Sequence, residues 1–226
     1  MKRLQPIRFP KRKLTRKTLL NFYQALHRYY GPRHWWPGET PFEVIVGAIL
    51  TQNTAWKNVE RAISNLKKEG VLSPEGMRAI SRSRLAGLIR PAGYFNIKAK
   101  RVKSFIHFLW SNYGGSLRKM FRTGPLRLRR ELLEVNGIGE ETADSILLYA
   151  GEKLSFVVDA YTRRVLKRHR YLRGDEEYGL IQQTFTDHLP KSAPLYNDFH
   201  AQIVEVGKDF CRKVPRCETC PLNKYL

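Results

Sequence analysis

The sequence has little negative charge and few cysteines, and each shortage excludes a class of protein. Only 20 Asp and Glu stand against 41 Lys and Arg, which gives the 226 residues a formal net charge of +21. The three cysteines all lie within residues 211–220, which excludes a scaffold held by disulfides. The longest nearly continuous apolar stretch, residues 44–50, is too short to span a bilayer, and no apolar segment follows the basic N-terminus as in a secretory signal. We therefore expect a soluble cytoplasmic protein that does not bind membranes.

The positive charges gather in three clusters. Residues 1–18 contain Lys and Arg but no acidic residue, and further basic clusters occupy residues 118–130 and 163–173. So large a positive charge mainly indicates what kind of molecule the protein binds, and a polyanion is the first candidate. Thermophilic proteins also carry many charges, but they usually balance Lys with Glu. The composition therefore predicts a nucleic-acid-binding protein, associated with the nucleoid.

Apolar residues recur with the period of a helix along most of the chain. The predicted helices are 16–30, 41–50, 54–69, 97–113, 126–135, 142–150, 158–169, 178–189 and 197–209. Clusters of Gly and Pro separate these segments, and the short apolar run 156–158 is too isolated to require a sheet. The sequence therefore predicts an all-α fold of helices joined by short loops, long enough for one large or two small domains.

The turn Gly137-Ile138-Gly139 is the most informative local motif. Glycine reaches backbone angles closed to other residues, so the chain can reverse tightly between two amphipathic segments. The amide N–H groups that open the next helix are then uncovered, and the helix dipole favours an anion there. These features predict a hairpin that binds a DNA phosphate. The alternative is an ordinary connection between two helices.

Five further blocks, together with this hairpin, give the chain a specific resemblance. They are residues 35–37, 47–54, 90–96, 157–161 and 199–205. With the cysteine-rich segment, they resemble the helix-hairpin-helix DNA glycosylases of the endonuclease III superfamily, and most of all the endonuclease III-like 3-methyladenine DNA glycosylases. The resemblance implies base-excision repair of double-stranded DNA containing damaged bases, by a monomer.

The resemblance also implies a domain organisation. A six-helix barrel that carries the helix-hairpin-helix would span 41–155. A second helical domain would combine 19–40 with 156–226, after a basic arm at 1–18. The family has its active-site cleft between the two domains.

Two acidic residues bear on the mechanism that the resemblance implies. At the place of Glu141, the strand-cleaving members of the superfamily have a lysine, whose amine forms a Schiff base with the sugar. Glutamate cannot do this, so we expect a monofunctional enzyme that uses water. Asp159 is the predicted catalytic residue, since a carboxylate stabilises positive charge developing on the sugar and can deprotonate water. The alternatives are a helix N-cap for Asp159 and a first-turn acid for Glu141.

The remaining site residues follow from the resemblance. Gln52 would fill the space that the flipped nucleotide leaves, and Tyr94 would lie on a second intercalating loop. The hairpin residues Gly137, Ile138 and Gly139 would also contact the DNA. The base pocket would be formed by aromatic faces that stack on a cationic purine, together with Glu141. These aromatic-pocket residues are Trp35, Trp36, Pro37 and Trp56. The alternative is that these tryptophans belong to the core.

The segment Cys211-x5-Cys217-x2-Cys220 resembles the [4Fe–4S] loop of the superfamily. A fourth cysteine is expected near position 226, which is Leu226, and four thiolates are the usual requirement. The loop is therefore degenerate, cut short in this sequence, or completed by another ligand such as the terminal carboxylate. Zinc would also lack a fourth Cys or His nearby. No cofactor is needed for the chemistry. The relatives that lack a cluster have a lysine near position 202, where this chain has Gln202.

Three functions stay open at this point. The leading one is a monofunctional glycosylase for alkylated purines, above all 3-methyladenine. The second is a glycosylase of the same fold for oxidised or mismatched bases. The third is a non-catalytic helix-hairpin-helix DNA-binding protein, which would need neither Asp159 nor Gln52.

Overall fold

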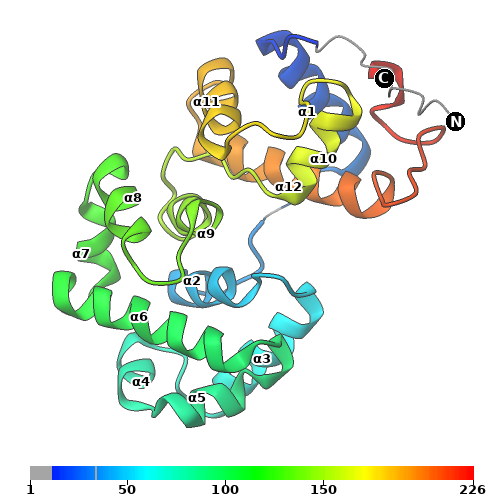
Figure 1. Ribbon diagram of the computed structural model, residues 1–226. Helices are drawn as coiled ribbons and strands as arrows, with labels where there is room; N and C mark the ends of the chain where they lie inside the picture. The colour runs from blue at the N-terminus through cyan, green and yellow to red at the C-terminus, as the bar shows by residue number, and fades with distance from the viewer. Residues whose placement is uncertain (1–11, 34) are drawn as a thin grey trace, which may run out of the picture. The chain divides into compact units, whose positions relative to one another are not determined.

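The computed structural model describes residues 12–33 and 35–226, and its regular elements there are helices (Figure 1). The longer elements are α1 (Arg16–Tyr30), α2 (Pro41–Leu50), α3 (Trp56–Lys68), α6 (Phe95–Tyr113), α8 (Pro125–Leu133), α10 (Ala160–Arg168), α11 (Tyr178–His188) and α12 (Ala193–Asp209). The shorter ones are α4 (Pro74–Ala79), α5 (Arg82–Leu88), η1 (Arg90–Ala92), α7 (Leu117–Arg122), α9 (Glu140–Ser145), η2 (Ile146–Ala150) and η3 (Asn223–Tyr225). Among these described residues, no helix is long and apolar enough to cross a membrane.

The chain divides into two compact units. The hairpin unit is Trp35–Ser155, and the split unit combines the described residues before it with Phe156–Leu226. The hairpin unit therefore also contains residues 35–40, which the sequence analysis had grouped with the terminal segments. Their place is explained by Trp36, whose ring packs on Trp56 of α3. Of the expected basic arm, residues 1–11 lie outside the described residues, and α1 begins at Arg16.

The hairpin unit is built around α2. All its residues from Phe42 to Leu50 are buried, as expected of a helix that is apolar on every side. Thr40 begins the helix, because its hydroxyl accepts a hydrogen bond from the amide of Glu43 (3.1 Å), and Pro41 takes the first position. Packing of α2 against α3, α6, α9 and η2 makes the core. The structure also has α4, α5 and α7, three short helices that the periodicity did not predict.

The split unit packs α12 against α1 and α10. Its core is aromatic: the ring of Phe156 stacks on Phe185 at 4.0 Å between centroids, and Tyr196 and Phe199 meet Phe156 edge-on. Thr15 caps α1 through a hydrogen bond from the amide of Thr18 (3.2 Å). This unit carries Asp159, at the start of α10.

Candidate active site and nucleic-acid interface

The predicted phosphate-binding hairpin is the turn between α8 and α9. Gly137 has a φ of +89°, a conformation that favours glycine, and the buried Ile138 donates its amide to the carbonyl of Val135 (3.0 Å). Gly139 is the N-cap of α9, and no side chain caps the helix there. The first amides of α9 are therefore not satisfied by a capping side chain, at the end where the helix dipole is positive.

The two hairpin glycines have different surroundings. A Cβ atom built on Gly137 would lie 2.2 Å from Cγ of Arg101, so any other residue at this position would clash with the Arg101 side chain. A Cβ atom on Gly139 would meet nothing within 4 Å, and the φ of Gly139 is an ordinary −94°. The fold therefore requires glycine at 137, whereas the open space at 139 leaves the backbone accessible to a ligand.

A buried ion pair fixes α9 against α8. The carboxylate of Asp144 is fully buried and accepts two hydrogen bonds from Arg129, from Nε at 2.9 Å and Nη2 at 3.0 Å. The hydroxyl of Ser155 donates a third hydrogen bond to this carboxylate, at 2.5 Å. Such a bidentate pair is geometrically specific. It holds the two helices of the hairpin at one angle.

Gln52, the predicted wedge, is tied to the hairpin. Its Nε2 donates to the carbonyl of Gly137 (3.1 Å) and to Oγ1 of Thr142 (2.9 Å). Its Oε1 accepts a hydrogen bond from Arg101 of α6. Gln52 and the hairpin residues are therefore brought together in one network. Arg101 was not expected from the sequence, since it is one of many Arg residues and belongs to no motif.

The predicted pocket tryptophans form a cluster in the hairpin unit. The ring of Trp36 lies edge-on to Trp56 at 5.1 Å and to Trp35 at 5.7 Å, measured between centroids, while Pro37 is exposed. Trp36 also packs on the buried Tyr149 of η2 at 5.3 Å, a residue that sequence reasoning did not single out. The rings of Trp35, Trp36 and Trp56 are only partly buried, so they are not simply core residues.

Glu141 and Tyr94 are both exposed. Glu141 lies in the first turn of α9, and its carbonyl accepts a hydrogen bond from Ser145 (2.7 Å). Tyr94 precedes α6 in a left-handed conformation (φ 44°, ψ 34°), and 71% of its surface is exposed. An exposed aromatic ring on a strained residue is unusual, and such outliers are frequent at functional sites.

Asp159 begins α10 in the split unit. Its Oδ1 accepts a hydrogen bond from the amide of Thr162 (2.7 Å), and its Oδ2 lies 3.6 Å from Nε2 of His200, on α12. Both side chains are largely buried. Burial by itself raises the pKa of the Asp159 carboxyl, but the nearby His200 and the hydrogen bond from the Thr162 amide outweigh it, so that the pKa lies below its usual value. The carboxylate therefore stays ionised, and it caps the helix as well.

The family model for HhH-GPD superfamily base excision DNA repair proteins matches residues 46–191. The chain belongs to this superfamily. A protein of Methanocaldococcus jannaschii, a DNA repair glycosylase by name, is 49% identical over 209 residues, which cover 92% of this chain and 94% of the relative. The endonuclease III of Thermotoga maritima is 28% identical and covers 82% of each chain.

Two solved structures show the same fold. The H. pylori 3-methyladenine DNA glycosylase bound to 1,N6-ethenoadenine superimposes with a TM-score of 0.76 at 29% identity, over 86% of this chain and 98% of the other. An endonuclease III–DNA complex gives a TM-score of 0.79 at 21% identity, over 94% and 95%. These matches confirm the predicted family and the two-domain all-α fold. The protein is a base-excision repair glycosylase, and DNA is its partner.

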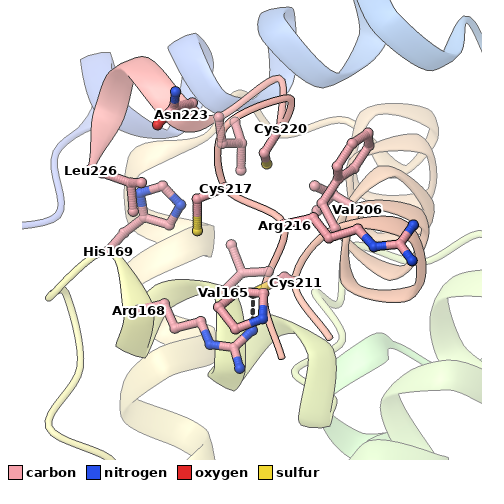
Figure 2. A pocket seen from close by; sticks show the side chains of 13 residues that line it. Val165, Arg168, His169, Val206, Cys211, Arg216, Cys217, Cys220, Asn223 and Leu226 are labelled. Atoms are coloured by element: carbon pink, nitrogen blue, oxygen red, sulfur yellow. Dashed lines mark hydrogen bonds between the residues drawn. The ribbon is translucent and has the colours of Figure 1, made fainter. Parts of the chain in front are cut away.

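The cysteine-rich loop of this glycosylase lies in the split unit (Figure 2). Cys211, Cys217 and Cys220 line a cavity of about 20 Å³, which has room for about one water molecule. No three His, Cys, Asp or Glu side chains of the described chain are grouped so as to hold a metal ion. A four-iron cluster usually takes four thiolates, and the fourth position is Leu226. The arrangement of these residues therefore does not confirm the possible cluster, and it gives no set of ligands for a zinc ion among the described residues.

Hydrogen bonds from two arginines of α10 hold the loop. Arg164 of α10 donates to the carbonyls of Cys211 (2.5 Å) and Gly207 (3.0 Å). Arg168, one turn later, donates from Nη1 to Sγ of Cys211 (3.2 Å) and from Nη2 to the carbonyl of Lys213 (3.1 Å). Burial raises the pKa of the Cys220 thiol, which favours its neutral form.

Gln202 of the glycosylase is fully buried on α12. Its Nε2 donates to the carbonyl of Gly31 (2.7 Å) and approaches the carboxylate of Asp198. Asp198 also accepts hydrogen bonds from Tyr23 (3.0 Å), His27 (2.9 Å) and the amide of Arg33 (2.8 Å). In this chain Gln202 therefore links the C-terminal end of α1 to α12 through a hydrogen bond.

Proposed function

We propose that this glycosylase hydrolyses the N-glycosidic bond of alkylated purines, above all 3-methyladenine, and leaves the strand uncut. The observation that carries the proposal is the partly exposed cluster of Trp35, Trp36 and Trp56, with Glu141 in the same unit. Aromatic faces attract an electron-poor, cationic base, and stacking contributes about 1–3 kcal/mol per base. The similarity to the H. pylori enzyme supports the same substrate class.

The chemistry needs few groups when the base is already cationic. A water oxygen forms a bond to C1′ of the sugar while the bond from C1′ to the purine nitrogen breaks. The purine leaves with the bonding electrons and becomes neutral, so it needs no general acid. Asp159 stabilises the positive charge on the sugar and takes the proton of the attacking water. Its lowered pKa keeps the carboxylate ionised at neutral pH, so the negative charge is present when the positive charge develops on the sugar.

Strand cleavage by a Schiff base needs an amine, and the hairpin offers a carboxylate at Glu141. We propose that Glu141 instead attracts the positive charge of the methylated purine. Gln52 would fill the space of the flipped nucleotide and Tyr94 would stack from a second loop. We further propose that the protein acts as a monomer.

The test uses purified protein and methylated duplex DNA. Released bases are identified by chromatography, and strand nicking is scored in parallel on the same samples. We expect free 3-methyladenine without nicks. Asp159→Asn should bind the duplex as the wild type does and release almost no base, whereas Asp175→Asn, a change at an exposed position of the same unit, should leave the activity intact.

Each other result points to a different conclusion. Release of oxidised or mismatched bases instead of alkylated purines would move the substrate to that class. A nicked product in the wild-type reaction would refute the monofunctional mechanism, because another amine would then be the nucleophile. DNA binding with no release of any base would indicate a binding protein.

A further inference from the structure

Arg101 lies on the second turn of α6, outside every site that the motifs predict, yet it contacts two of them. Its guanidinium donates to Oε1 of Gln52. Its aliphatic stem lies so close to Gly137 that a Cβ atom there would be 2.2 Å from Cγ of Arg101 and 2.7 Å from Cδ. One side chain therefore borders both the predicted wedge and the predicted phosphate-binding hairpin.

The hydrogen bonds around Gln52 define how its amide is turned. An arginine only donates, so it must face the amide oxygen, and a carbonyl only accepts, so it must face the amide nitrogen. Gln52 meets both requirements: Oε1 faces Arg101, and Nε2 faces the carbonyl of Gly137 at 3.1 Å. Oγ1 of the buried Thr142 accepts from the same nitrogen at 2.9 Å. Without Arg101, nothing in this network would hold the amide oxygen.

The network also joins three segments that are distant in sequence. Gln52 follows α2, Arg101 belongs to α6, and Gly137 and Thr142 flank the start of α9. All of them lie in the hairpin unit. A side chain held from both sides loses little rotamer freedom on binding, which lowers the entropic cost of inserting it into a duplex.

We propose that Arg101 is a positioning residue that holds Gln52 against the hairpin, so that the wedge and the phosphate contact engage DNA in one register. The inference rests on the proposed function for the role of Gln52. Arg101 acts through Gln52 and not on the reacting bond. The competing explanation is that Arg101 is one more phosphate contact in a strongly basic protein, and the two explanations predict different responses to salt.

The variants are Arg101→Met, Gln52→Ala and the double variant. Methionine keeps an unbranched stem beside Gly137 and removes the donors. Lys100→Met is the matched control, since Lys100 is the preceding residue of α6, is exposed and has the same charge. Each protein is titrated with a duplex carrying a tetrahydrofuran abasic analogue and with the undamaged duplex, over a salt series. A 2-aminopurine beside the target site reports base flipping, and thermal melting checks the fold.

We expect Arg101→Met and Gln52→Ala each to lower the preference for the abasic analogue by about three- to tenfold, the range for one or two lost hydrogen bonds. The double variant should lose no more than Gln52→Ala alone, because both changes break one network. The salt dependence of Arg101→Met should match that of the wild type, and Lys100→Met should keep the full preference.

Three results would overturn the inference. A loss in the double variant equal to the product of the two single losses would mean that the residues act independently. A salt slope lower by about one in Arg101→Met, with unchanged preference, would identify a phosphate contact. A wild-type protein with no preference for the analogue would leave nothing for Arg101 to position. None of these readouts requires base release. If the double variant loses no more than Gln52→Ala but the wild type releases no 3-methyladenine, only the proposed substrate is contradicted.

Discussion

Gly137→Ala and Gly139→Ala add the same methyl group to the same turn, but the structure predicts different effects. The first should lower the stability of the fold, and the second should weaken DNA binding. At 137 the alanine must adopt a φ of +89°, which costs about 1–2 kcal/mol for a residue with a Cβ atom. It must also displace the stem of Arg101 from 2.2 Å, an overpacking that typically costs about 1–3 kcal/mol. We expect a total loss of about 2–5 kcal/mol, or roughly 4–20 °C in Tm for a chain of this size.

At 139 the backbone angles are ordinary and the added methyl meets no atom within 4 Å. The Tm should therefore stay within about 2 °C of the wild type. The methyl would, however, stand beside the first amides of α9, where the predicted phosphate would bind. Loss of one charge-assisted hydrogen bond, worth about 1.5–3 kcal/mol, should weaken DNA binding by about tenfold or more.

The assay pairs thermal melting with fluorescence anisotropy on a labelled duplex. Gly87→Ala is the control, because Gly87 lies in α5 with no atom near its Cβ position and outside the hairpin. If Gly139→Ala melts and binds DNA as the wild type does, the hairpin is not the phosphate contact. An unchanged Tm for Gly137→Ala would refute the steric argument about Arg101.

Three further predictions concern titratable groups. His200→Gln should move the acidic limb of the pH–rate profile to higher pH, because the pKa of Asp159 rises when the imidazole is lost; an unmoved limb would show that His200 only packs. Glu141→Gln should lower release of cationic 3-methyladenine more than release of neutral ethenoadenine, and equal losses would argue against charge recognition. Lys98 is 1% exposed, donates to the carbonyl of Ala92 (2.7 Å), and burial and Arg101 lower its pKa to about 8. Between that pKa and the unfolded value near 10.5 the unfolded state binds more protons, so Lys98 should make the free energy of unfolding rise with pH by up to about 3 kcal/mol. In Lys98→Met the rise measured by chemical denaturation should be smaller by this amount, and an equal rise would contradict the assignment.

Local chemistry made the hairpin and Asp159 predictable from the sequence. A Gly-x-Gly between two periodic segments predicts the turn, and an aspartate before an amphipathic segment predicts a helix start, which the Thr162 amide bears out. Periodicity located the long helices, but α4 and α5 are too short to show a period, and they depend on the caps Ser73 and Ser81.

Contacts between distant segments could not be predicted from one sequence. His200 stands in a recognisable block, but only the packing of α12 on α10 brings it to Asp159. Arg101 and Tyr149 look like any basic or core residue until the fold places them beside Gln52 and Trp36. The cysteine spacing suggested a cluster because spacing is visible in sequence, whereas the grouping of the thiols depends on the fold.

The interrupted path of the chain has a consequence for its synthesis. The hairpin unit is one continuous stretch, so all its parts have been made once Ser155 has left the ribosome. The split unit is completed later: the bond between His27 and Asp198 joins residues 171 positions apart, and the helices on which α1 packs, α11 and α12, lie in the last third of the chain. Bringing the two parts of the split unit together costs conformational entropy, because a long stretch of chain separates them. A hairpin unit that has already folded lowers this cost, since less of that stretch is still flexible. During translation the hairpin unit can thus be complete while the split unit is not, and a chain stalled at that stage would carry the predicted phosphate-binding hairpin without the folded unit of Asp159, the predicted catalytic residue.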